Sequence, residues 1–275
     1  MLKPSEILEN SYITAENKTK ISIPKLLILG FFAGLFIAFG AEASNMIAFN
    51  LLSNPETFGL GRMVAGAIFP VGLILVVFLG AELWTGNCLM ITALLEKKIP
   101  LSKMLKNWVF VYIGNFIGAV FLAFCMQFSG LFSVGDDGLA KTTFNIALNK
   151  CNISLSSAII LGILCNILVC LAIFMASSSK SAAGKIMAIF LPIYLFVASG
   201  FEHSIANMYY ITAGLLTFHF NPDLLPITAE INLSNFNIFG FLFHNLLPVT
   251  IGNFIGGSFF VGFLTWILYR KKLDK

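Results

Sequence analysis

Apolar segments separated by short polar loops fill most of the sequence. A helix needs about 20 predominantly apolar residues to cross the hydrocarbon core of a bilayer. Six segments meet this requirement, at about residues 26–51, 64–95, 108–128, 156–176, 186–218 and 246–269. The pattern therefore predicts an all-α polytopic membrane protein with six transmembrane helices.

The second and fifth segments contain polar residues near their middle. Residues 80–87 read Gly-Ala-Glu-Leu-Trp-Thr-Gly-Asn and residues 200–207 read Gly-Phe-Glu-His-Ser-Ile-Ala-Asn, so both follow Gly-x-Glu-x-x-x-x-Asn. An ionisable side chain at membrane depth needs a partner, a water-filled cavity or a function. We expect both helices to be interrupted at these glycines. Broken helices at corresponding positions in two halves of a membrane protein point to a transport site.

Further motifs recur between the two halves. Residues 113–118, Ile-Gly-Asn-Phe-Ile-Gly, return unchanged at 251–256, and Ala-Ile-Phe at 67–69 returns at 188–190. Because a unit of three spans is odd in number, its second copy must insert upside down. We therefore expect a 3+3 inverted repeat with halves at about 25–128 and 156–270 and with the two breaks meeting near the midplane. The Gly-x-x-x-Gly spacing also fits close packing of helices.

Positive charge is distributed unequally over the loops. Of the 17 lysines and arginines, only Arg62, Lys141 and Lys150 lie in the loops on one side. Basic residues remain on the cytoplasmic side of a membrane, so both termini are expected there. This gives a cytoplasmic arm at 1–24, amphipathic or extended, a single transmembrane channel domain at 25–270 and a cytoplasmic tail at 271–275. The arm has no apolar core typical of a signal peptide.

Composition narrows the class of protein. Hydrophobic residues make up 58% of the chain and charged residues 11%, and the mean hydropathy is +0.89; a soluble domain has about 25% charged residues. The net charge of +4 does not indicate nucleic acid, because the basic residues lie beside spans. The five cysteines lie mostly in apolar segments and indicate neither a disulfide framework nor a metal site. No cofactor is indicated.

Taken together, the motifs resemble those of the formate/nitrite transporter family. The resemblance rests on residues 80–87, 162–170 and 200–208 and on Gly-Asn-x-x-Gly in the last span, in this order over essentially the whole chain. The chain as a whole resembles the hydrosulfide branch. The family implies a homopentamer of aquaporin-like protomers in the inner membrane of a bacterium. Each protomer is expected to conduct small monovalent anions such as hydrosulfide, formate or nitrite through its own pore.

The resemblance also implies roles for particular residues. Thr85 and His203, on the loops that break the two spans, would meet at the pore centre. Three polar side chains would lie along the same substrate pathway: Glu202, Asn166 and Asn253. Four apolar side chains would form constrictions: Phe69, Leu73, Leu83 and Phe196. Trp84 stands where many members have Phe, which leaves the packing and selectivity of that loop open.

Several alternatives remain open or are disfavoured. Lys150 either attracts anions to the outer mouth or is an exposed, unpaired lysine. Glu82 fits a structural role near a half-helix N-terminus, and Glu202 fits a joint role with His203. Glu42 lies near the outer end of its span and has no assigned function.

A water or glycerol channel would need two Asn-Pro-Ala boxes, which the sequence lacks. An intramembrane enzyme is disfavoured because one histidine and two distant acids make a poor ligand set. A proton-coupled symporter of the same anions stays open.

Overall fold

The computed structural model describes residues 1–225 and 231–270, and these ranges fold into helices joined by loops. Six helical segments in them are long and apolar enough to cross a membrane, in agreement with the predicted spans. The expected tail, 271–275, lies outside the described residues. The spans are α2 (Ile23–Leu52), α3 with α4 (Phe58–Ile68 and Pro70–Leu79), α7 (Leu101–Phe128), α9 (Leu155–Ser177), α10 (Ala182–Ser199) and a continuous run of η4, α12, η5 and α13 (Gly240–Leu246, Leu247–Phe254, Ile255–Phe263 and Leu264–Tyr269).

The second span is interrupted at Gly80, the predicted position. α4 ends there because Gly80 adopts a left-handed conformation with φ 71°, which costs little without a Cβ atom. Residues 81–83 are not helical. The chain becomes helical again at α5 (Trp84–Asn87) and continues through η1 (Cys88–Met90) and α6 (Ile91–Leu95).

The fifth span is interrupted in the same way. α10 ends at Gly200, whose φ is 81°. Residues 201–203 are not helical, and α11 (Ser204–Phe220) begins directly after them. Both predicted breaks are therefore confirmed, and each is followed by the N-terminus of a half-helix. The second span has an additional kink between α3 and α4, where Pro70 lacks the N–H that a continuous helix needs.

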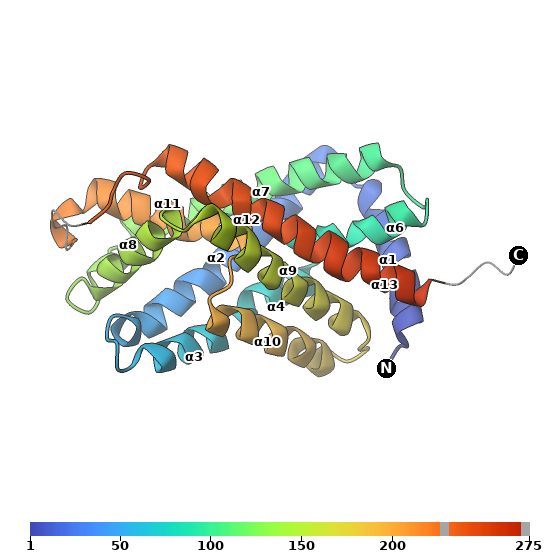
Figure 1. Cartoon of the computed structure of the whole chain (residues 1–275), viewed down its shortest axis with the longest axis horizontal. Coiled ribbons are helices and arrows are strands. Elements are labelled where there is room, and N and C mark those ends of the chain that lie inside the picture. Colours follow the sequence, from blue (N-terminus) through green and yellow to red (C-terminus); the bar gives the residue numbers. More distant parts are fainter. Residues whose placement is uncertain (226–230, 271–275) are drawn as a thin grey trace, which may run out of the picture.

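In the described residues, α1 (Pro4–Thr19) and α8 (Gly138–Cys151) belong neither to the six spans nor to the half-helices that follow the two breaks. The N-terminal arm forms α1, which contacts α6, α7 and α13. The loop after the third span contains α8, which contacts α11 and α2. Figure 1 shows α1 beside α13 at one end of the molecule and α8 at the opposite end. The remaining short 3₁₀ helices are η2 (Leu131–Ser133) and η3 (Pro222–Leu224).

The repeated Gly-x-x-x-Gly motifs bring two pairs of helices into close contact. A Cβ atom at Gly118 of α7 would lie 2.0 Å from the carbonyl oxygen of Phe31 on α2. A Cβ atom at Gly256 would lie 2.2 Å from the carbonyl oxygen of Ile163 on α9. Only glycine allows such close approach of backbones. The same contact thus occurs in both halves, and it positions the two helices that carry Asn115 and Asn253.

Candidate functional site

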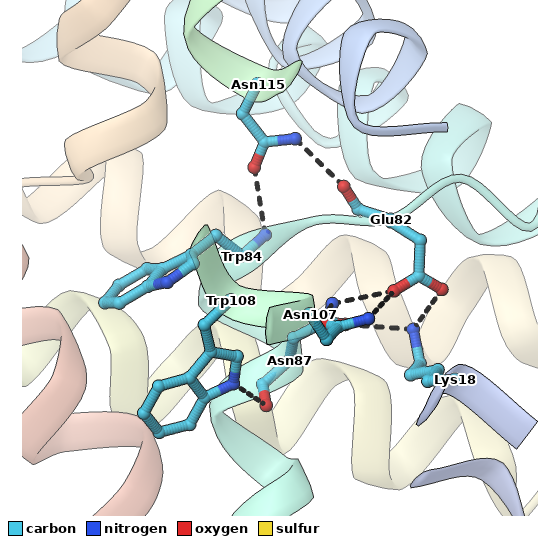
Figure 2. Close-up of polar contacts among 7 residues, drawn as sticks. All are labelled: Lys18, Glu82, Trp84, Asn87, Asn107, Trp108 and Asn115. Atoms are coloured by element: carbon cyan, nitrogen blue, oxygen red, sulfur yellow. Dashed lines mark hydrogen bonds and ion pairs between the residues drawn. The ribbon is translucent and has the colours of Figure 1, made fainter. Parts of the chain in front are cut away.

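Glu82 at the first break has its carboxylate engaged by three side chains (Figure 2). Lys18 Nζ donates to Oε1 at 2.6 Å, and Asn87 Nδ2 and Asn107 Nδ2 donate to Oε2 at 2.7 and 3.3 Å. Only 4% of Glu82 is exposed, and a buried carboxylate requires such partners. Because Lys18 belongs to α1, the N-terminal helix contributes directly to the first break. This geometry agrees with a structural role for Glu82.

Asn115 holds the non-helical backbone of the first break (Figure 2). Its Oδ1 accepts the N–H of Trp84 at 2.9 Å, so it caps the first residue of α5. Its Nδ2 donates to the carbonyl oxygens of Glu82 at 2.9 Å and Gly30 at 2.8 Å. All hydrogen-bonding groups of this buried amide are used, as expected for an interior polar side chain. Asn115 therefore fixes the break against α2.

The second break is built from the same residue types. Lys150 Nζ donates to Glu202 Oε1 at 2.8 Å, and Asn207 Nδ2 donates to Oε2 at 2.6 Å. Asn253 Oδ1 accepts the N–H of Ser204 at 2.9 Å, and its Nδ2 donates to the Glu202 carbonyl oxygen at 2.9 Å. Lys150 lies on α8, just as Lys18 lies on α1.

The two networks correspond position by position. The corresponding pairs are Lys18 and Lys150, Glu82 and Glu202, Asn87 and Asn207, Asn107 and Asn245, and Asn115 and Asn253. The repeated unit therefore includes α1 and α8, and it is larger than the expected halves at 25–128 and 156–270. Since α1 and α8 lie at opposite ends of the molecule (Figure 1), the two copies are inverted relative to each other.

The halves meet at a hydrogen bond between Thr85 and His203. Thr85 Oγ1 lies 2.9 Å from His203 Nε2. Thr85 is the second residue of α5, so its expected place on the loop is corrected: the half-helix begins at Trp84. His203 caps α11, and its Nδ1 accepts the N–H of Ala206 at 3.2 Å. The two half-helix N-termini thus meet through these two side chains.

The hydrogen bonds assign the state of the His203 ring. Because Nδ1 accepts from a backbone N–H, it cannot carry a proton, so the proton lies on Nε2 and the ring is neutral. Nε2–H then donates to Thr85 Oγ1, which leaves the Thr85 hydroxyl hydrogen to be donated to a third group. The corresponding positions of the other copy, Leu83 and Ile205, are apolar. The pair is therefore the point where the two copies differ chemically.

Apolar side chains lie beside His203. The rings of Phe69 and Phe196 lie 5.3 Å apart in an edge-to-face arrangement, and the Phe196 ring lies 6.0 Å from that of His203. Leu73 and Leu83, also named from the sequence, are buried like the two phenylalanines, with 1% and 3% of their surface exposed. Phe69 stands at the kink between α3 and α4, so the proline kink helps to position its ring.

Two cavities approach the pair from different sides. The larger, of about 530 Å³, lies between α1, the first break and α9, and reaches Lys18, Glu82 and Leu83. The smaller, of about 100 Å³, lies at the second break and reaches His203 and Phe196. Thr85 lines neither cavity, and none of its surface is exposed. The Thr85–His203 pair and its apolar neighbours therefore separate the two cavities.

The structure corrects the interpretation of some polar residues. Lys150 is not unpaired: it is bound to Glu202, and 15% of its side chain is exposed. Glu202 directs its carboxylate to Lys150 and Asn207, so the expected joint role with His203 has no direct contact to support it. Glu42 accepts a hydrogen bond from Tyr209 and lines neither cavity.

The two asparagines expected on the pathway are bound to backbone groups. Asn166 Nδ2 donates to the carbonyl oxygens of Thr85 at 3.2 Å and Asn253 at 2.7 Å. Asn253 caps α11, as described above. Both residues are fully buried and line neither cavity. Their amides hold the half-helices in place and lie away from the cavities.

Lys18, Asn107 and Asn245 were not predicted from the sequence as members of the two networks. The signal was present in the repeats. Asn-Lys at residues 17–18 returns at 149–150, and Asn107 and Asn245 precede the repeated hexapeptide by the same interval. Their role depends on the equivalence of α1 and α8, which is a property of the folded chain.

Comparisons with known proteins agree with this geometry. A family model described as formate/nitrite transporter matches residues 5–267. The chain is 39% identical over 273 residues to the formate channel BtFdhC of Bacillus thuringiensis, covering 98% of this chain and 96% of that protein. It is 36% identical over 257 residues to the formate channel FocA of Haemophilus influenzae, covering 90% and 89%. A solved structure described as a pentameric formate channel with formate bound matches with a TM-score of 0.78 and 33% identity, over 90% of this chain and 98% of that chain.

Proposed function

Because the chain belongs to the formate/nitrite transporter family, we propose that it conducts small monovalent anions, with formate as the principal substrate, between the two cavities. The observation that supports this most is the Thr85–His203 hydrogen bond, which joins the two half-helix N-termini beside the apolar ring of Phe196. Helix N-termini favour negative charge. Several relatives are named formate channels, and this supports formate as the substrate.

The apolar side chains of Phe69, Leu73, Leu83 and Phe196 select which species crosses. An ion that passes between them must leave its water shell, and an isolated charge in an apolar medium is very costly. The Thr85 hydroxyl supplies a hydrogen bond to the anion at this point. The rings of Phe69 and Phe196 exclude hydrated cations, because a cation would have to lose its water shell between them.

His203 makes the conduction sensitive to pH. The neutral ring can only orient Thr85, because a neutral imidazole is a poor acid. A cationic ring can donate a proton to the anion, but it must give up the hydrogen bond from Ala206. The charged anion therefore passes when His203 is neutral, and the neutral acid passes when a protonated His203 has given the anion its proton.

The assembly and orientation follow the same proposal. The homopentamer is supported by the solved pentameric channel that the chain resembles. Both termini are placed in the cytoplasm of a bacterial cell, by the distribution of lysine and arginine. The cavity at His203 then faces outward, and the cavity at Glu82 faces the cytoplasm.

The test is anion flux into vesicles that contain the purified protein. We expect formate to enter these vesicles faster than it enters vesicles without protein. Lactate should enter them more slowly than formate does. Nitrite and hydrosulfide are measured in the same series. Hydrosulfide is included because the sequence was expected to resemble the hydrosulfide branch of the family. Absence of formate flux above that of empty vesicles would contradict the proposal.

A proton-coupled symporter is the competing mechanism. In a symporter the neutral His203 would be protonated, and would give up its proton, in each transport cycle. Electrical measurement separates the two. A formate gradient across a planar bilayer drives a current through a channel, whereas an electroneutral formate–proton symporter transports formate without current. We expect the current.

A further inference from the structure

The small cavity at the second break contains one unbalanced positive charge. Three charged residues line it: Arg62, Lys150 and Glu202. Lys150 and Glu202 form an ion pair, and the Lys150 ammonium also lies 5.3 Å from the centre of the Tyr210 ring. In the part of the chain that the structure describes, Arg62 belongs to no ion pair. A monovalent anion in the cavity would balance this charge.

Arg62 is held in place by the end of α10. Its Nε donates to the carbonyl oxygen of Ala198 at 3.3 Å, and one Nη donates to that of Val197. These carbonyls belong to the last turn of α10, where the helix dipole favours a cation. A guanidinium has five N–H donors, so the two backbone contacts leave further donors for the cavity that Arg62 lines.

Asn45 supplies a second observation from another helix. It lies on α2, lines the same cavity and has 2% of its surface exposed. Its Nδ2 has no hydrogen-bond partner among the residues that the structure describes. Buried amide donors are almost always paired, so this group indicates a place for an acceptor atom from outside the chain.

We propose that Asn45 Nδ2 and the Arg62 guanidinium form a binding site for one small monovalent oxyanion, with a monocarboxylate such as formate as the expected ligand. The site rests on the proposed function and extends it, because it lies in the cavity in front of His203. A volume of about 100 Å³ admits an anion of this size together with some water. Lys150 cannot serve this purpose alone, since Glu202 already neutralises it.

The first experiment measures the formate concentration that gives half-maximal flux into vesicles. Asn45→Leu removes the unpaired donor and keeps the branching of the side chain, and Arg62→Lys keeps the charge but loses the planar set of donors. We expect about a tenfold increase in the half-saturating concentration for each variant, the effect of one hydrogen bond to a charged group. Lys141→Gln is the matched control, because the Lys141 ammonium donates to the backbone carbonyl oxygen of Asp136 and Lys141 lines neither of the two cavities. Unchanged half-saturation in both variants would overturn the site.

A second measurement does not depend on transport. Crystals of the wild type soaked in bromide are expected to show an anomalous peak between Asn45 and Arg62, and crystals of Asn45→Leu are expected to lack it. If the wild type transported no anion, the proposed function would fail, and the bromide peak alone would decide the site. A wild-type cavity without the peak would overturn the site even if formate flux is observed.

Discussion

His203 shows at the scale of one residue how local geometry decides protonation. Its Nδ1 accepts a backbone N–H and its Nε2 faces a hydroxyl, so both contacts are satisfied by the neutral ring alone. Protonation on Nδ1 would place two hydrogens against each other. The residue therefore changes its contacts, and not only its charge, when it titrates.

Replacing His203 with Asn should abolish the pH dependence of formate flux that comes from the protein. Asn is a good helix N-cap, so it can still accept the N–H of Ala206, and the fold should persist. It has no titratable group, so flux should no longer change as the pH falls, apart from the titration of formate itself. The measurement is initial formate flux over a pH series, and His219→Asn, on a histidine that lines neither cavity, is the control. An unaltered pH profile in His203→Asn would mean that His203 is only structural.

Replacing Lys150 with Gln should destabilise the protein. Glu202 would remain with a buried and uncompensated carboxylate, 6% exposed. Breaking such a pair costs about 3 kcal/mol, the lower end of the usual range, because part of Lys150 is exposed. Thermal unfolding in detergent checks this.

The double variant Lys150→Gln with Glu202→Gln is the control for charge. It should recover most of the lost stability, because neither position then carries a charge that has lost its partner. A double variant as unstable as the single one would show that Lys150 acts through packing.

At this scale the sequence pattern singled out His203 and the two acids, because ionisable residues stand out in an apolar segment, whereas Thr85 was expected from the family resemblance. It did not predict their partners. Lys18 is separated from Glu82 by the whole of α2, and a contact between distant segments leaves no trace in local spacing. The family resemblance assigned Asn166 and Asn253 to the pathway, because sequence likeness does not tell whether an amide faces a cavity or a backbone carbonyl.

At the scale of elements, the breaks were predicted and the flanking helices were not. Gly80 and Gly200 end their helices for a local reason, the left-handed conformation that glycine tolerates. α1 is held by burial of Ile7, Leu8 and Ala15, a tertiary effect that a 16-residue polar segment does not reveal by its pattern. α8 was missed for a similar reason, because it was assigned to a loop between spans.

The close contact between α9 and the sixth span predicts a sharp effect of one methyl group. Gly256→Ala should destabilise the protein by about 1–3 kcal/mol, the cost of overpacking, because its Cβ would lie 2.2 Å from the Ile163 carbonyl oxygen. Gly59→Ala, at a position where a Cβ meets no atom within 4 Å, should be close to neutral and is the control. Equal unfolding temperatures for the two variants would contradict the tight packing.

At the scale of the whole molecule, the inverted repeat places chemically similar networks at two ends, and charge decides how they face the membrane. Each break has one lysine from a helix outside the six spans, so the two networks themselves carry the same charges. The asymmetry comes from the loops. Lys97, Lys98, Lys103 and Lys106 lie around the loop at one end, whereas α8 and Asp223 belong to the loops of the other end in the six-span order.

This asymmetry predicts the orientation in the cell. Lys98 and Asp223 are both exposed, and the positive-inside rule places Lys98 in the cytoplasm and Asp223 outside. Single cysteines at these positions, in a variant with the exposed Cys125 replaced by Ser, should react differently with a membrane-impermeant maleimide. In intact cells only the cysteine at Asp223 should be labelled, and the one at Lys98 should react only after the membrane is opened.

The Cys125→Ser parent, which should remain unlabelled, is the control. Labelling of both positions in intact cells would contradict the six-span order, and labelling of Lys98 alone would mean that the cavity at Glu82 faces outward.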